Sequence, residues 1–106
     1  WLFPGDTRDY SLAGLPPFTD IDGVFAHLWL GRGCALDASP PLLNDFCQYF
    51  INLKPKRMVV THLQELGRGP LDYWTVEHCH QVFSILNKDA PGIKIHFALT
   101  GQVLYL

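Results

Sequence analysis

The sequence predicts a single α/β domain in which helices cover a mixed β-sheet. Short apolar runs of strand length recur along the chain, and two longer segments between them repeat apolar residues at helical spacing. The 106 residues suffice for one compact domain, which we expect to span residues 1–106. Because 48% of the residues are hydrophobic and the formal net charge is −2, the composition excludes intrinsic disorder and a general nucleic-acid-binding surface.

Strands are expected at four apolar runs, residues 1–3, 23–30, 58–60 and 93–99. Residues 58–60 (MVV) are apolar on both faces, as in the interior of a sheet covered on both sides. Residues 93–99 alternate between apolar and polar side chains, so His96 is expected to be exposed. Thr100-Gly101 is a plausible tight turn into residues 102–106, which predicts a C-terminal hairpin.

The first of two main helices is expected to begin at Ser39-Pro40. Ser39 can cap the helix, and a proline at the first helical position loses no needed hydrogen bond. Lys54-Pro55 ends this helix. Its apolar face carries Leu43, Phe46, Phe50 and Leu53.

The second helix is expected from about Leu71 to Asn87. His78 and His80 lie on it two residues apart, so their side chains point in divergent directions. We therefore expect them on a solvated helix face rather than at one metal ion.

The cysteines and the apolar runs together predict a cytoplasmic protein. Cys34, Cys47 and Cys79 are odd in number and widely spaced, which favours buried free thiols in a reducing compartment. No apolar run approaches the roughly 18 residues of a membrane span, so no membrane partner is expected. The chain begins at Trp1, already inside an expected strand, which suggests a piece of a longer protein.

Asp6 and His62 are the candidate metal ligands. Each follows an apolar strand, and in open α/β sheets the groups that meet ligands sit at the carboxyl ends of strands. A carboxylate can bridge two cations, and a neutral imidazole is a common zinc ligand. The alternative is that each residue forms only capping or loop hydrogen bonds.

Four segments in this order resemble the C-terminal half of the metallo-β-lactamase-fold hydrolases. They are Phe3-Pro4-Gly5-Asp6-Thr7-Arg8, Ala26-His27-Leu28, Val59-Val60-Thr61-His62-Leu63 and residues 97–106. The Gly-Asp-Thr form is most similar to the phosphodiesterase and tRNA-maturation nuclease branches. The resemblance implies half of a four-layer αββα sandwich.

The resemblance also implies a metal-dependent hydrolase acting on a phosphodiester or related ester, with a small-molecule or nucleotide substrate. Asp6 would bridge two divalent metals (zinc, manganese or iron), and His62 would bind one of them. Thr7 would support the site, Arg8 would meet an anionic substrate, and His27 has a possible role near the metals. For Arg8 a surface salt bridge, and for His27 a place in the core, are the alternatives.

The family's His-x-His-x-Asp-His motif is absent from this chain. The resemblance therefore implies a missing N-terminal half as partner, with no catalytic competence and no tight metal binding in these residues alone. Association into a homo-oligomer also remains open. The alternative function is a non-catalytic α/β interaction module whose exposed apolar edge docks a partner.

Overall fold

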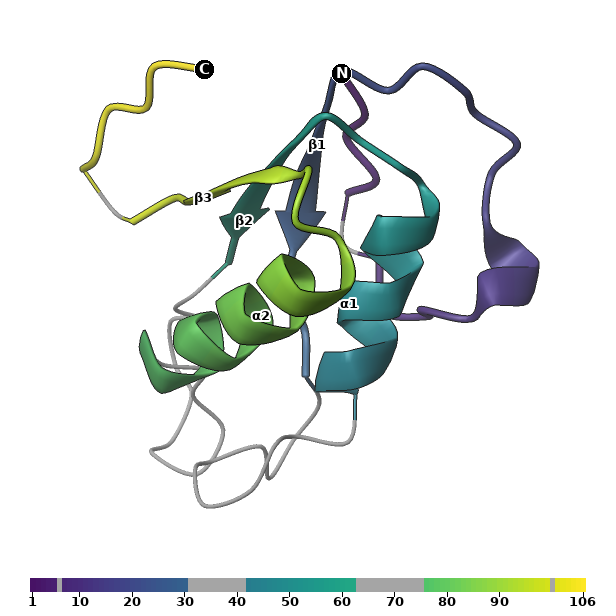
Figure 1. Ribbon diagram of the computed structural model, residues 1–106, viewed down its shortest axis with the longest axis horizontal. Coiled ribbons are helices and arrows are strands. Elements are labelled where there is room, and N and C mark those ends of the chain that lie inside the picture. Colours follow the sequence, from purple (N-terminus) through teal and green to yellow (C-terminus); the bar gives the residue numbers. More distant parts are fainter. Residues whose placement is uncertain (6, 31–41, 63–75, 100) are drawn as a thin grey trace.

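A three-stranded parallel sheet forms the centre of the molecule (Figure 1). The computed structural model describes residues 1–5, 7–30, 42–62, 76–99 and 101–106. The strands are β1 (Gly23–His27), β2 (Arg57–Thr61) and β3 (Lys94–Phe97), and they lie in the order β1-β2-β3. The register aligns their first residues and places His27 beside Thr61 at the carboxyl ends of β1 and β2. The predicted α/β class is confirmed.

Helix α1 (Leu43–Asn52) connects β1 to β2, and α2 (Val76–Asp89) connects β2 to β3. Parallel strands joined in this way normally have right-handed crossovers. Two such crossovers that advance in the same direction across a sheet place both helices on the same face, as Figure 1 shows. The described part of the chain therefore forms one helix layer and one sheet layer.

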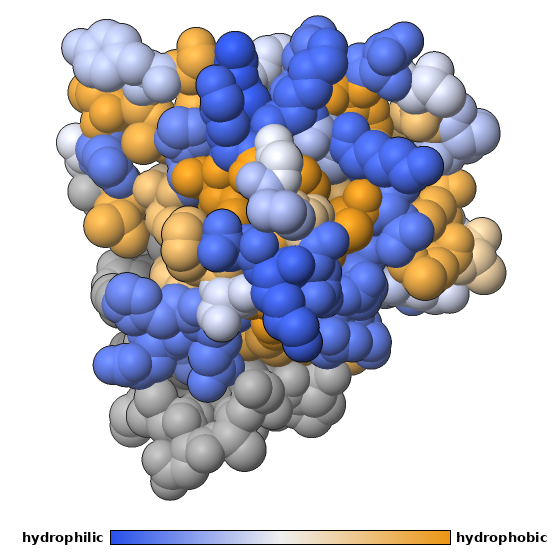
Figure 2. All heavy atoms as spheres, in the orientation of Figure 1, coloured by the Kyte–Doolittle hydropathy of each residue, from blue (hydrophilic) through white to orange (hydrophobic). Residues whose placement is uncertain are grey.

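The main hydrophobic core lies between the sheet and the two helices. Val24 and Ala26 of β1 and Met58 and Val60 of β2 are fully buried there. The helices contribute a larger set, namely Leu43, Phe46, Cys47, Tyr49, Phe50, Cys79, Val82 and Leu86. On the outer surface of this layer hydrophilic side chains alternate with hydrophobic ones, as expected of amphipathic helices (Figure 2).

Cys47 and Cys79 are free and buried, as predicted, and Cys34 lies outside the described residues. Desolvation, with a smaller contribution from Asp89, raises the pKa of the Cys47 thiol to about 12. This thiol is therefore neutral near pH 7. Neither helix of the described part of the chain is long and apolar enough to cross a membrane.

The opposite face of the sheet, which we call the far face, carries a second, smaller group of side chains. Phe25, Val59 and His96 lie side by side across the three strands. Val59 is fully buried without belonging to the main core. The rings of Trp1 and Phe3 pack on Phe25, with centroid distances of 5.4 and 4.7 Å.

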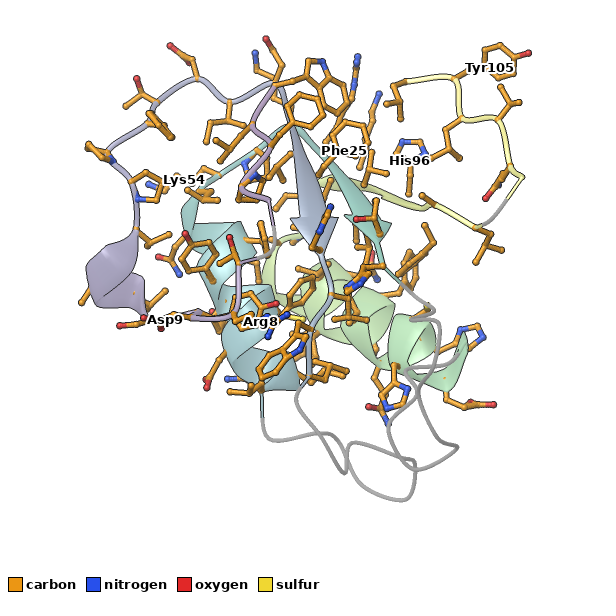
Figure 3. The ribbon with its side chains drawn as sticks, turned by 180° about the vertical axis from the view of Figure 1, so that it is seen from behind. Arg8, Asp9, Phe25, Lys54, His96 and Tyr105 are labelled. Carbon is orange, nitrogen blue, oxygen red and sulfur yellow. The ribbon has the colours of Figure 1, made fainter. Side chains whose placement is uncertain are left out.

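His96 is half-buried on this face, so its predicted exposure is wrong (Figure 3). The alternating pattern placed it on the side away from the helices, but that side is itself partly covered because Val59 and the aromatic residues lie there.

The predicted N-terminal strand reduces to one backbone bridge between Leu2 and Val24, which is parallel. The ring of Trp1 lies directly against Gly23, where an added Cβ would come within 2.4 Å of the ring. Any larger residue at position 23 would therefore displace Trp1. This contact fixes the start of the chain at the outer edge of β1.

The predicted C-terminal hairpin is wrong, and the described strands do not form the predicted mixed sheet. Gly101 does adopt a left-handed conformation (φ 80°), and Gln102 N donates to Leu99 O at 3.0 Å, so a turn forms. Residues 102–106 do not pair back onto β3, and Tyr105 points away from the sheet (Figure 3). The side chains of this tail stay largely exposed, so the return strand would have no buried face to stabilise it.

The helices agree with the predicted periodicity, although both predicted starts, Ser39 and Leu71, lie outside the described residues. Helix α1 ends at Asn52, and Lys54 just beyond it adopts a left-handed conformation (φ 51°) and donates its N–H to Ile51 O at 2.9 Å. On α2, His80 is exposed but His78 is buried, with 2% of its surface accessible. The prediction of a solvated face is wrong for His78 because this turn of α2 packs inward beside Cys79.

Candidate functional site

The carboxyl ends of β1 and β2 bring two histidines together. The rings of His27 and His62 have a centroid distance of 5.7 Å and an interplanar angle of 29°. His27 is the last residue of β1, and His62 directly follows β2. His27 was predicted to have only a possible role beside a metal site, whereas the parallel register makes it a neighbour of His62.

The backbone of His62 is left-handed, with φ at 67°. For a residue with a side chain this conformation costs about 1–2 kcal/mol relative to the right-handed region. Backbone conformations of this kind cluster at functional sites, where the surrounding structure maintains them. Among the described residues Asp20 and Lys54 are also left-handed, but of the three only His62 is a candidate ligand predicted from the sequence.

Tyr10 hydrogen-bonds to the backbone at the carboxyl end of β1, on the edge that faces away from β2. Its hydroxyl donates a hydrogen bond to His27 O at 3.0 Å and accepts one from Trp29 N at 3.1 Å. The sequence predicts no role for Tyr10. The only signal was a large aromatic residue inside a segment rich in glycine and proline, which hints at an anchor but does not identify its partners.

Arg8 and Thr7, the two predicted helpers of the site, lie in the same N-terminal segment. The guanidinium of Arg8 lies over the ring of Trp29, 5.5 Å from the centroid, close to α1 (Figure 3). Trp29 is only two residues beyond His27, so Arg8 lies near the same end of the sheet. Thr7 uses its hydroxyl to donate to Pro4 O at 3.0 Å.

Asp6 lies outside the described residues, so the predicted pairing of Asp6 with His62 stays a prediction. Among the described residues, no group of three or more His, Cys, Asp or Glu side chains could hold a metal ion. His27 and His62 supply two nitrogen donors, whereas zinc sites use three or four protein ligands. The described residues therefore do not form a complete metal site.

Two further polar atoms at this end are buried without a hydrogen-bond partner in the described part of the structure. They are the hydroxyl of Thr61 and the indole nitrogen of Trp29. Such groups are uncommon in folded proteins because an unmade hydrogen bond leaves the cost of desolvation uncompensated. The carboxyl end of the sheet therefore has a hydroxyl and an indole N–H beside the two histidines whose hydrogen-bonding potential is not satisfied by the described residues.

The amino end of the sheet contains a different kind of feature. An open cavity of about 480 Å³ is lined by Trp1, Asp22, Lys56, Arg57, Gly92 and Lys94. Lys56 Nζ lies 2.7 Å from Asp22 Oδ1, and both side chains are well exposed. This ion pair lowers the pKa of Asp22 and raises the pKa of Lys56. It has the properties of an ordinary solvated surface pair.

Comparison with known proteins finds no matching protein family, curated protein or solved structure.

Proposed function

We propose that this chain supplies part of the active site of a metal-dependent hydrolase of the metallo-β-lactamase type, acting on a phosphodiester or a related ester. The observation that carries the proposal is the pairing of His27 and His62 at the carboxyl ends of neighbouring strands. Active-site groups of open α/β sheets gather at this end.

The separation of the two rings is compatible with a shared cation. A zinc ion lies about 2.0–2.1 Å from an imidazole nitrogen, so the centres of two rings on one ion lie roughly 5–6 Å apart. The distance of 5.7 Å between His27 and His62 falls in this range. Two imidazoles are too few for tight binding, and the carboxylate of Asp6 is the expected further ligand.

The layering also supports the proposal. A four-layer αββα sandwich divides into two halves, each with helices on one face of a sheet and another sheet on its other face. The described residues have this two-layer arrangement, with α1 and α2 on one side of the sheet (Figure 1). On the far face, Trp1 and Phe3 remain 48% and 68% exposed, so that face presents apolar surface to a further layer.

Each residue then has a defined task. A bound divalent ion supplies Lewis-acid activation of water and of the phosphoryl oxygen. His62 and His27 would hold the ion through ring nitrogens, and Asp6 would add a negative charge that offsets the charge of the metal. Arg8, placed by its contact with Trp29, attracts the anionic ester.

The test is zinc binding by the 106-residue chain, measured by calorimetry and by the absorption spectrum of the cobalt-substituted protein. Weak binding that is lost in His62→Ala and Asp6→Ala, and weakened in His27→Ala, is the expected result. His80→Ala is the matched control because His80 is exposed on α2. If His62→Ala and His80→Ala bind zinc equally, the proposal is wrong.

Hydrolysis of a generic phosphodiester tests the second part of the proposal. Two or three ligands are too few for a complete binuclear site, so we expect no turnover by this chain alone. Tight stoichiometric zinc binding with turnover would contradict the claim that the chain supplies only part of the site.

The exposed apolar side chains of the far face favour one second candidate, a non-catalytic interaction module. This function predicts a chain that binds no metal and uses the surface around Phe3 and Phe25 to dock a partner. Light scattering combined with the zinc titration separates the two functions. A well-behaved monomer without zinc affinity supports the module.

A further inference from the structure

The backbone groups on the outer edge of β1, the edge that faces away from β2, form hydrogen bonds with two different parts of the N-terminal segment. At the amino end of β1, the backbone of Leu2 pairs with the strand: Leu2 N donates to Gly23 O at 2.9 Å, and Phe25 N donates to Leu2 O at 3.0 Å. This is the ordinary pairing of a parallel strand, one residue long.

At the carboxyl end of β1, a side chain rather than a backbone segment makes the hydrogen bonds to this edge. The hydroxyl of Tyr10 accepts from Trp29 N and donates to His27 O, two groups further along the same edge, beyond Phe25 O and His27 N. A hydroxyl can make both bonds because it is one donor and an acceptor at once. The other edge is held by β2, since Leu28 N donates to Thr61 O at 3.1 Å.

We propose that Tyr10 is a positioning residue that holds the backbone of His27 so that its ring faces His62. The part of this inference that concerns metal binding rests on the function proposed above. Without the hydroxyl, the chain at residues 27–29 would be tied to the sheet on one edge only, and His27 could turn away from His62.

The aromatic ring of Tyr10 explains why the hydroxyl is a fixed point. The ring packs against Phe46, Tyr49 and Phe50 of α1, with centroid distances of 5.4, 5.9 and 6.3 Å. Only 5% of Tyr10 is exposed. The hydroxyl thus connects the strand end to the aromatic cluster that Tyr10 forms with α1.

The test compares Tyr10→Phe with Tyr49→Phe. Each variant loses one hydroxyl from the same aromatic cluster and keeps its ring, but Tyr49 makes no hydrogen bond to β1 in the described part of the chain. Two properties are measured: nuclear Overhauser effects between the rings of His27 and His62 in the metal-free protein, and the affinity for zinc.

We expect Tyr10→Phe to weaken the ring-to-ring signals and to lower zinc affinity about tenfold, the low end of the effect of residues that orient metal ligands. Tyr49→Phe should leave both unchanged, and circular dichroism should show that both variants are folded. Equal signals and equal affinity in the two variants would overturn the inference.

The two measurements separate this inference from the proposed function. If the unchanged chain binds no zinc, the proposed function fails, and the signals between the rings still decide whether Tyr10 positions His27. If Tyr10→Phe does not fold, Tyr10→Trp, which keeps a large ring with a donor, provides the second variant. If Tyr10→Trp keeps the wild-type signals between the rings of His27 and His62 and its indole N–H donates to His27 O, the inference is supported. If the signals are kept without that hydrogen bond, the inference is overturned.

Discussion

Val59 and Val60 are neighbours on β2, are both fully buried, and belong to different faces of the sheet. Val60 packs into the core beneath α1 and α2, whereas Val59 lies on the far face beside Phe25 and His96. The helix-covered face holds nearly all the large buried side chains. The far face carries His27 at its carboxyl end. The comparison teaches that equal burial does not mean an equal role, because one face supplies stability and the other supplies the candidate site.

The largest effect is expected in the helix-covered face. Phe46→Ala removes a fully buried ring that contacts Tyr10 and Phe50. We expect the free energy of unfolding to fall by about 3–5 kcal/mol, the usual cost of deleting a core aromatic side chain. Urea unfolding followed by circular dichroism measures this loss. A loss below 1 kcal/mol would mean that this face does not carry the stability.

A matched pair on β2 sharpens the comparison. Val60→Ala should lower the free energy of unfolding by about 2 kcal/mol, because the cavity opens inside a rigid core. Val59→Ala should cost less, because its neighbours Phe25 and His96 are only half-buried and can move to fill the space. Urea unfolding of both variants decides. Equal losses would show that the two faces are packed equally well.

Two of the three left-handed non-glycine residues in the described part of the chain allow backbone strain beyond a helix end to be compared with strain at the candidate site. Lys54 lies two residues beyond the end of α1, and His62 lies at the candidate site. Because glycine adopts this conformation without penalty, Lys54→Gly should stabilise the fold by about 0.5–1 kcal/mol. His62→Gly should stabilise it similarly and abolish zinc binding, which would show strain kept for function. Thermal unfolding with a zinc titration tests both. Destabilisation by Lys54→Gly would contradict the strain argument.

The smallest effect is expected at the exposed pair Asp22–Lys56. Lys56 lowers the pKa of Asp22 below its unfolded value of 3.8, so the stabilisation is complete above that value and is lost as the pH falls through the folded pKa. Asp22→Asn should therefore leave the melting temperature at pH 7 nearly unchanged, and should flatten its decline only below about pH 4. Melting curves between pH 2 and 8 check this. A large effect at neutral pH would give the amino end of the sheet an unexpected role.

Much of the fold was predictable because periodicity reports which side of an element is buried. The spacing of Leu43, Phe46 and Phe50 predicted α1 and its inward face, and the apolar run at residues 58–60 predicted the central strand. The hairpin was predicted from the turn at Gly101, which does form. A turn does not ensure pairing, since the strand that follows must also bury a face.

The candidate site was predictable only in part, because the register between β1 and β2 decides which residues lie next to each other there. His62 was identified from its place after a strand. The relation of His27 to His62 depends on the alignment of His27 with Thr61, which no local pattern contains. The partners of Tyr10, which lies 17 residues before His27, and the burial of His78 depend in the same way on packing between distant segments.

The all-parallel order of the strands has a consequence for how the chain folds. In the described sheet no strand can pair with the next through a short turn, so each pairing must wait until an intervening helix has brought distant segments together. Closing such loops costs entropy before any contact repays it, which slows the search for the native topology. Because β2 pairs with both other strands, a mutation that delays its docking should slow the formation of the entire sheet.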